Sequence, residues 1–250
     1  MLRRLVDIVL AGIVLVVSLP VTLAAAVAIF AVNPGAVIFR AKRVGKSGRL
    51  FTMYKLRTMY IRGRDHGSVV TAAGDGRVFP LGRWLRRLRL DELPQMINII
   101  KGDMTFVGPR PRDPKIVEQC YTPLHRETLE VLPGLTSPGT LFYLTCGEST
   151  LPTRNPETEY QARVLPRKLA LDIDYVRNRS FWMDVRVAIR TIGAIFNVRR
   201  AGLDDHDVER VAGLIQPPRG GDGAGISPDA GGMDHSPEAR NGDQEDLRAR

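Results

Sequence analysis

The longest apolar stretch of the chain lies close to its N-terminus. Ile8 to Val32 run for 25 positions without a charged side chain, which is longer than the ~20 residues that cross a bilayer as a helix. Pro20 interrupts this stretch and removes a backbone hydrogen bond, and Ser18 is close enough to help satisfy the freed groups. A cleaved signal peptide is the alternative, but the apolar run continues past the alanines at 24–26 where cleavage would fall.

Basic residues flank the apolar stretch on both sides. Arg3 and Arg4 precede it, and five more cations follow between positions 40 and 49. Because basic flanks stay on the cytoplasmic side of a membrane, both ends are drawn to the same face. The sequence therefore favours a re-entrant membrane helix over residues 1–34, broken at Pro20, with a straight span as the alternative.

The next part of the chain predicts a β-hairpin and a loop. Residues 36–43 and 49–59 flank the Gly-containing turn "VGKSG", a pattern typical of two paired strands. The letters GKS do not belong to a phosphate-binding Walker loop, because Arg40 stands where that motif needs glycine. Residues 61–78 are rich in glycine, aspartate and arginine, and we expect a surface loop there.

Amphipathic helices are predicted over the rest of the body. Apolar residues recur at helical spacing over 81–88, and again over 93–100, where a helix is expected to begin near Glu92 and end at Gly102. Further helices are predicted over residues 114–131, 158–178 and 181–198. The helix at 81–88 and the last one combine aromatic and basic residues, as helices at a membrane surface do, although packing against a core is the alternative. We therefore predict a mainly helical α+β fold with a re-entrant membrane helix, a short β-hairpin and amphipathic interfacial helices.

Charge is distributed unevenly along the chain. Residues 201–250 hold 5 Lys and Arg against 11 Asp and Glu, whereas residues 1–200 hold 31 against 16. The last segment is also rich in glycine and proline and cannot bury enough apolar surface to fold. We predict a basic folded body over residues 35–203 and a disordered acidic tail over 204–250. A basic body indicates an anionic partner, which could be nucleic acid, anionic lipid or a phosphorylated substrate.

Two adjacent carboxylates, Asp91 and Glu92, stand between two arginine-containing segments. One interpretation is structural: Asp91 caps a helix, Glu92 favours the positive end of that helix, and the arginines are solvated. A helix N-terminus also binds anions, so capping and phosphate chemistry are compatible. The four histidines are not clustered and the two cysteines lack metal-ligand spacing, so neither a zinc site nor a disulfide is expected.

Four segments together resemble the bacterial sugar transferases, which are polyprenyl-phosphate phosphoglycosyl transferases. They occupy residues 42–59, 81–111, 132–140 and 171–192 in the family's order, and the block "DELPQ…KGDM…GPRP" is the most specific of them. The chain departs from the family pattern in that Leu19 separates serine from proline in the apolar helix, and the acidic tail has no counterpart in the core pattern.

The resemblance implies transfer of a sugar-phosphate from a UDP-sugar to a membrane polyprenyl phosphate, undecaprenyl phosphate, with release of UMP. This is the initiating step of exopolysaccharide, O-antigen, capsule or glycoprotein glycan assembly. The family likeness also implies that Asp91 is the nucleophile of a covalent aspartyl phosphosugar intermediate and that Glu92 holds Mg²⁺. Metal and cationic side chains would neutralise the anionic electrophile, and Mg²⁺ needs few protein oxygens.

The resemblance also implies a location and partners. The catalytic domain of residues 35–203 is expected at the cytoplasmic face of the bacterial inner membrane. Expected partners are the UDP-sugar, polyprenyl phosphate, membrane lipid and downstream glycosyltransferases. Nucleic acid is not expected, because no helix-turn-helix, zinc or RNA-binding motif occurs.

Cationic side chains in the matching segments are the candidates for phosphate and nucleotide contacts. They are Lys55, Arg57, Arg87, Arg110 and Arg112. Prolines on both sides of Arg110 fix its backbone, so this guanidinium is presented rigidly. Asp103 is either a local cap or a metal ligand, and the roles of Asp172 and Asp174 stay open.

Two other functions fit parts of the sequence. One is a membrane-anchored basic binding module without catalysis, which the charge of the body supports. The other is a glycosyltransferase that releases UDP. The released nucleotide distinguishes these three functions. A phosphoglycosyl transferase releases UMP, a glycosyltransferase of the other kind releases UDP, and a binding module releases neither.

Overall fold

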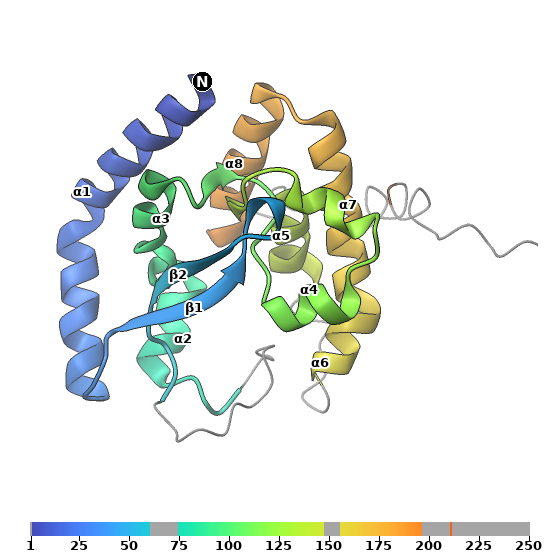
Figure 1. Cartoon of the computed structure of the whole chain (residues 1–250). Coiled ribbons are helices and arrows are strands. Elements are labelled where there is room, and N and C mark those ends of the chain that lie inside the picture. The colour runs from blue at the N-terminus through green and yellow to red at the C-terminus, as the bar shows by residue number, and fades with distance from the viewer. Residues whose placement is uncertain (1, 61–74, 148–155, 197–210, 212–250) are drawn as a thin grey trace, which may run out of the picture. The chain divides into compact units, whose positions relative to one another are not determined.

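The described part of the chain is a mainly helical α+β fold with two small sheets, as the sequence predicts (Figure 1). The computed structural model describes residues 2–60, 75–147, 156–196 and 211. Most of the predicted loop at 61–78 and nearly all of the predicted tail lie outside these residues. The helices are α1 Leu2–Val32, α2 Pro80–Arg87, α3 Gln95–Lys101, α4 Pro114–Cys120, α5 Pro138–Phe142, α6 Pro156–Glu159, α7 Leu165–Asn178 and α8 Phe181–Ile195. The strands are β1 Ile38–Val44, β2 Leu50–Leu56, β3 Thr105–Val107 and β4 Gly134–Thr136.

The two sheets each contain two strands. β1 and β2 form the predicted antiparallel hairpin, in a register that pairs Ile38 with Leu56. β3 and β4 are parallel, and glycine is required where they meet, because a Cβ on Gly134 would lie 2.1 Å from the backbone nitrogen of Gly108. This pairing places the "GPRPR" loop after β3 next to the segment "LPGLTSPGT", which therefore contains a strand and the start of α5.

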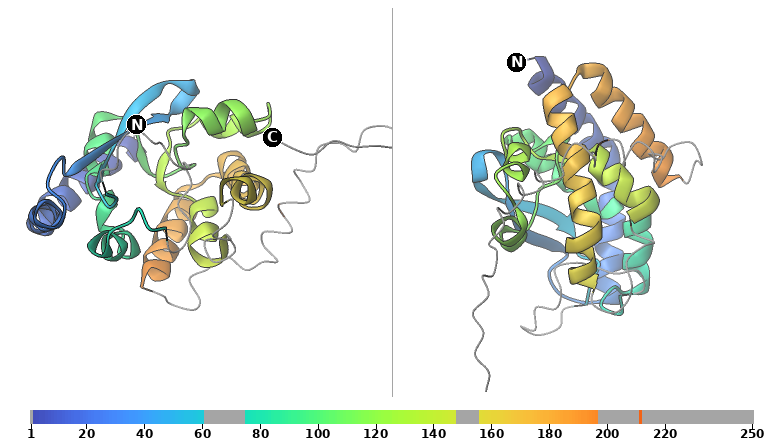
Figure 2. Two further views of the ribbon diagram at one scale, coloured as in Figure 1. Left: turned by 90° about the horizontal axis from the view of Figure 1, so that it is seen from below. Right: turned by 90° about the vertical axis from the view of Figure 1, so that its right-hand side faces the viewer.

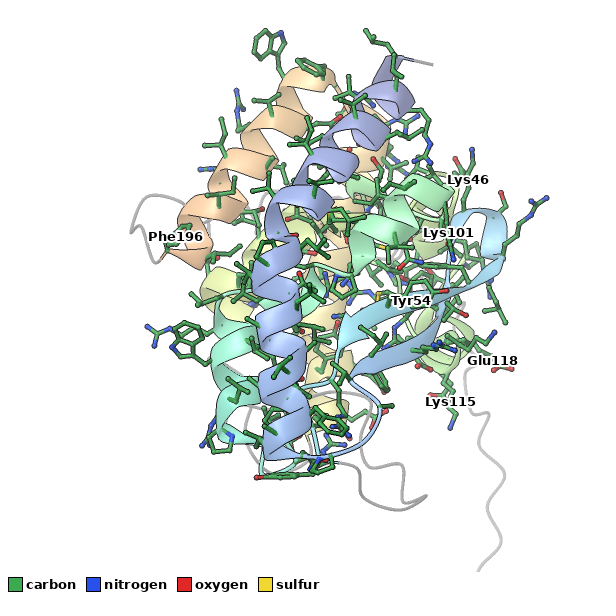
Figure 3. The ribbon with its side chains drawn as sticks, turned by 90° about the vertical axis from the view of Figure 1, so that its left-hand side faces the viewer. Lys46, Tyr54, Lys101, Lys115, Glu118 and Phe196 are labelled. Atoms are coloured by element: carbon green, nitrogen blue, oxygen red, sulfur yellow. The ribbon has the colours of Figure 1, made fainter. Side chains whose placement is uncertain are left out.

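α1 is one continuous helix of 31 residues with Pro20 inside it. Figures 1 and 3 show that it changes direction near its middle, as an internal proline favours, but does not turn back. The break predicted at Pro20 is therefore a bend within a helix. By length and composition α1 is long and apolar enough to cross a membrane. Only Ala11, Ala25 and Ile29 of its side chains are buried.

The polar start of α1 is bonded to the rest of the protein. The Arg4 guanidinium donates to the carbonyl oxygens of Ile100, at 2.9 Å, and Met104, at 3.4 Å. The Asp7 carboxylate accepts a hydrogen bond of 2.6 Å from the Thr105 hydroxyl. These contacts hold the first turns of α1 against the end of α3 and the start of β3.

The other end of α1 packs on a different part of the same unit. Ala25 and Ile29 belong to a cluster of buried apolar side chains that also contains Leu56, Phe79 and Leu85. α1 is thus attached near both of its ends, while most side chains between them are exposed.

α3 lies against the edge of β2. There the side chain of Asn98 forms hydrogen bonds with backbone groups that a third strand would otherwise pair with. Its side-chain amide accepts a hydrogen bond of 3.0 Å from the Tyr54 backbone nitrogen and donates one of 2.7 Å to the Thr52 carbonyl. The same amide donates to the Asp103 carboxylate at 3.2 Å, so Asp103 has a local structural contact. Since Asn98 is fully buried, these bonds fix α3 against the hairpin.

The predicted helices differ from the observed ones mainly at their ends. α3 begins after Pro94, later than the start expected near Glu92, and ends at Gly102 as predicted. The helix predicted over 114–131 ends at Cys120 and a separate 3₁₀ turn follows, because Pro123 cannot continue a helix. The helix predicted over 158–178 is observed as the end of α6, a π-helical turn over Tyr160–Val164 and α7, and the helix predicted over 181–198 is α8, which ends at Ile195. Figure 2 shows α7 and α8 beside each other after a short connection.

A core residue lies beyond position 203, where the sequence analysis placed the end of the folded body. Val211 is 5% exposed and belongs to the buried cluster that contains Leu165 and Leu169 of α7.

We expect truncation after residue 216 to leave the unfolding temperature unchanged, since the composition of the removed segment cannot form a core. Truncation after residue 204 should destabilise the protein, because a buried valine contributes about 1.5–3 kcal/mol. Thermal unfolding of both variants in detergent checks this, and equal unfolding temperatures would contradict a core role for Val211.

Candidate active site

The carboxylate pair lies on a tight turn between α2 and α3. After α2, Arg89 adopts a left-handed backbone conformation with φ 58°, which residues other than glycine rarely do. The chain then forms a 3₁₀ turn over Leu90–Glu92 and enters α3 through Pro94. This path buries both carboxylates, with Asp91 6% and Glu92 5% exposed.

Glu92 is held by cations from three separate segments. Its Oε1 accepts hydrogen bonds from Lys55 of β2 at 3.0 Å, from Arg89 at 2.8 Å and from Arg110. Arg110 also donates to the Leu135 carbonyl at 3.0 Å. Burial by itself would raise the pKa of Glu92, but Arg110, Lys55 and Arg89 hold this pKa well below its usual range. Glu92 is therefore a fixed negative charge.

Asp91 has a different environment from its neighbour. Its Oδ1 is buried and has no hydrogen-bond partner in the described part of the chain. Burial, and then the adjacent Glu92, raise the pKa of Asp91, while Lys55 and Arg89 oppose this rise. A buried carboxylate oxygen without a partner costs free energy, and such groups call for an explanation such as a catalytic role.

The capping role that the sequence suggested for Asp91 is wrong. Neither the 3₁₀ turn nor α3 receives a side-chain cap hydrogen bond. The physical reason is the path of the chain: the residue before the first turn of α3 is Pro94, so Asp91 lies too far ahead of the helix to reach its free N–H groups.

The oxygens of the pair fit the ligand preference of Mg²⁺. This ion takes one or two protein carboxylates and completes its shell with water and substrate phosphates. Asp91 Oδ1 has no protein partner, and Glu92 Oε2 has one long contact with Arg110, at 3.4 Å. Three cations surround Glu92 Oε1, so Glu92 could hold the metal only through Oε2. Within the described residues no group of three His, Cys, Asp or Glu gathers, so substrate oxygens would have to supply further ligands.

Two of the five cations expected to contact phosphate lie at the dyad. These are Lys55 and Arg110, which bind Glu92 directly. Arg87 does not join them, because its side chain is exposed at the end of α2. The third cation at Glu92 is Arg89, which was not among the residues expected from the sequence. Its spacing of three residues from Glu92 was the available signal.

The other residues singled out in the sequence lie away from the dyad. Arg57 is buried and donates to the Asn33 carbonyl, just after α1. Asp174 accepts a hydrogen bond from Asn178 at the surface, at 2.9 Å. Neither residue bonds to a carboxylate of the dyad.

Arg112 belongs to a second buried group that the sequence analysis did not find. Its guanidinium donates to the Tyr160 hydroxyl, and Lys168 of α7 lies 5.4 Å from the centre of the same ring. Asp172, one turn further along α7, accepts a hydrogen bond of 3.0 Å from the Gly139 backbone nitrogen. Burial lowers the pKa of Lys168 and raises that of Asp172. The role left open for Asp172 is therefore to join α7 to the start of α5.

Comparison with protein families gives one match that covers most of the chain. The family described as "Bacterial sugar transferase" matches residues 1–198. This range contains the dyad and all the cations around it.

Several curated proteins are also similar to the chain. The UDP-glucose:undecaprenyl-phosphate glucose-1-phosphate transferase of Caulobacter vibrioides is 33% identical over 80% of this chain and 71% of that protein. The UDP-N-acetylgalactosamine-undecaprenyl-phosphate N-acetylgalactosaminephosphotransferase of Aeromonas hydrophila is 34% identical over 78% of this chain. A UDP-glucose:undecaprenyl-phosphate glucose-1-phosphate transferase of Escherichia coli is 33% identical over 77%. The chain spans only 43% and 39% of the latter two proteins.

The contacts of Glu92 predict unequal effects for two arginines. Arg110→Met removes bonds to a buried carboxylate and a carbonyl, so we expect a loss of about 1.5–3 kcal/mol in the free energy of unfolding. Arg87→Met is the matched control, and its exposed side chain should change stability by less than about 0.5 kcal/mol. Denaturant unfolding of both variants measures the difference. Equal losses would show that Arg110 is not held as described.

Proposed function

The chain belongs to the bacterial sugar transferase family, and we propose that it transfers a sugar-phosphate from a UDP-sugar to undecaprenyl phosphate with release of UMP. The family and the named relatives make it a transferase. The observation that carries the proposal is the unpaired, buried Oδ1 of Asp91 beside a Glu92 that three cations fix in place. A protein that only bound anions would have no use for this oxygen.

In the proposed reaction Asp91 is the nucleophile. Its carboxylate oxygen attacks the β-phosphorus of the UDP-sugar, the bond from that phosphorus to the bridging oxygen breaks, and UMP leaves. A phosphate oxygen of the lipid acceptor then attacks the same phosphorus and releases Asp91, forming the polyprenyl diphosphate sugar. Covalent catalysis of this kind separates one difficult transfer into two steps. It also lets a soluble donor and a lipid acceptor use one site in turn.

The residues around the dyad supply the charge that the reaction needs. A carboxylate that attacks a diphosphate meets negative charge, which Lys55, Arg89 and Arg110 lie close enough to offset. Mg²⁺, bound through Glu92 Oε2 and substrate oxygens, would add charge neutralisation at the diphosphate. Glu92 keeps the three cations directed to one point, because its own charge orients them.

The exposed apolar side chains support a membrane-bound enzyme. They cover most of α1 and extend to the aromatic side chains of α2 and α8 and to Phe196 just after α8. Trp84 is 61%, Trp182 75% and Phe196 71% exposed. Figure 3 shows α1 and α8 together on one side of the described unit. Arg186 and Arg190 accompany the aromatics on α8, as in helices that lie at the surface of anionic lipid.

The contacts of α1 support a helix that enters the membrane from one side only. A straight helix of this length is about 46 Å long, so a crossing would carry its two ends to opposite sides. Arg3 pairs with Asp184 of α8 at 3.2 Å, whereas Ile29 is buried against Leu56 at the end of β2. A crossing would break one of these sets of contacts. The basic flanks then favour the cytoplasmic side for both ends, at the bacterial inner membrane.

Cysteine accessibility tests this topology. In a protein whose native cysteines at 120 and 146 are replaced by serine, Leu2→Cys and Lys46→Cys should react with a membrane-impermeant thiol reagent only after the cytoplasmic face is opened. Val17→Cys, in the exposed apolar part of α1, is the matched control and should stay unreactive in lipid. Labelling of Leu2→Cys from the periplasmic side would contradict the proposal.

Substitution of the dyad tests the chemistry. Asp91→Asn should fold normally but release almost no UMP, because an amide cannot attack the β-phosphorus. Glu92→Gln should also lose most turnover, since neither Mg²⁺ nor the three cations would have their anionic partner. The measurements are UMP release and thermal unfolding, with Asp174→Asn at the surface as a control that should keep its activity.

Detection of the covalent intermediate is a stricter test of the proposed mechanism. With a UDP-sugar labelled at the β-phosphate and no lipid acceptor, the wild-type protein should release UMP and carry label on Asp91. Label on another residue, or release of UDP, would show that the proposed mechanism is wrong.

A further inference from the structure

We propose that a cavity beside the C-terminal end of α1 captures the phosphate of the lipid acceptor, and that Arg57 is the main residue that binds this phosphate. This proposal rests on the proposed function, because it assigns one of the two substrates to a place of its own. The site lies apart from the dyad, where Lys55 and Arg110 bind Glu92.

The cavity has a volume of about 460 Å³, which lies within the range of pockets that hold small ligands. Its walls combine two cations with apolar side chains. The lining residues are Ala36, Ile38, Phe39, Arg40 and Arg57. Ile38 and Phe39 are 38% and 52% exposed, so an apolar chain could lie against them while its phosphate meets the cations.

Arg57 has donors that the protein does not use. Its side chain is 6% exposed, and Nη2 donates to the Asn33 carbonyl. Nε and Nη1 are buried and have no partner in the described part of the chain. A buried guanidinium with unsatisfied N–H groups is costly, and a phosphate that accepts from these groups would offset the cost with charge-assisted hydrogen bonds.

A purely structural role explains only part of this arrangement. A cation beside the carbonyl groups at the end of α1 stabilises that helix end, and the Nη2 contact with Asn33 does this. The role does not explain why Nε and Nη1 are buried without a partner, or why Arg40 lines the same cavity. Two cations facing one cavity indicate an anionic ligand.

The position of the cavity favours the lipid acceptor over the nucleotide donor. It adjoins the end of α1, whose exposed apolar side chains include Val27, Phe30 and Val32. A phosphate here can therefore stay attached to a chain that lies in lipid. Arg57 follows Lys55 by two residues, about 7 Å along an extended strand, so the cavity is close in the chain to the lysine that binds Glu92.

The first test compares the two substrates in the full-length protein in lipid nanodiscs. Arg57→Gln should raise the KM for undecaprenyl phosphate by about tenfold or more, as expected for lost hydrogen bonds to a charged group. The KM for the UDP-sugar should change by less than about twofold, and the first-turnover release of UMP without acceptor should persist. Arg57→Lys should restore part of the affinity, and Arg49→Gln, exposed in the hairpin turn, should leave both KM values unchanged. An increase in the KM for the UDP-sugar, or no increase for the lipid, would overturn the assignment.

The second test measures binding directly and does not depend on turnover. A short polyprenyl phosphate with a photoreactive group in its first isoprene unit should crosslink to Ile38 or Phe39 in the wild-type protein. Unlabelled undecaprenyl phosphate should compete, whereas inorganic phosphate or phosphatidylglycerol at the same concentration should not. Equal competition by phosphatidylglycerol, or crosslinks elsewhere, would contradict a specific acceptor site.

The two tests separate this proposal from the proposed function. If the wild-type protein released no UMP, the proposed function would fail, and the crosslinking result would still decide whether the cavity binds a lipid phosphate. If Arg57→Gln does not fold, Arg40→Gln replaces it in the comparison of KM values. An unchanged KM for the lipid in Arg40→Gln, together with crosslinks away from the cavity, would overturn the proposal in that case.

Discussion

The rest of the site depends on one interaction, the pairing of the buried Glu92 carboxylate with cationic side chains. Glu92 is almost fully enclosed, and an ionised group in such a place is tolerated only when opposite charges surround it. Its partners come from β2, from the turn after α2 and from the loop after β3. One side chain therefore joins three segments of the chain, and the loss of Glu92 would leave the cations Lys55, Arg89 and Arg110 close together without their shared anionic partner.

Two other contacts hold these segments in register so that the pairing can occur. Asn98 bonds to both sides of the β2 edge, which fixes the hairpin, and Lys55 with it, against α3. The parallel pair of β3 and β4 brings the Leu135 carbonyl to Arg110, so its guanidinium is bound on two sides. Neither sheet could be stable as an isolated pair of strands. Their role is to position cations, and the helices around them supply the burial.

The sequence predicted elements with a strong pattern and missed features that depend on tertiary contacts. The hairpin, the apolar helix and the stop of α3 at Gly102 follow from local signals, and the adjacent Asp91 and Glu92 were found by their unusual surroundings. The contact between Arg89 and Glu92 depends on a left-handed turn at Arg89, and in the sequence only the spacing of three residues pointed to it. The buried group around Arg112, Lys168 and Asp172 could not be found either, since it joins helices that meet only in the folded chain.

The arrangement also explains how a single carboxylate could serve a soluble donor and a lipid acceptor. α1 is attached near both ends, by Arg4 to the carbonyls at the end of α3 and by Ile29 to the apolar cluster that includes Leu56. A helix held in this way keeps its exposed apolar face at a fixed distance from the dyad. The depth of the protein in the bilayer would then set the height of Asp91 above the lipid, and the covalent step would need no large movement between the two substrates. If α1 anchors the protein in a membrane as proposed, it is thus also part of the geometry of the site.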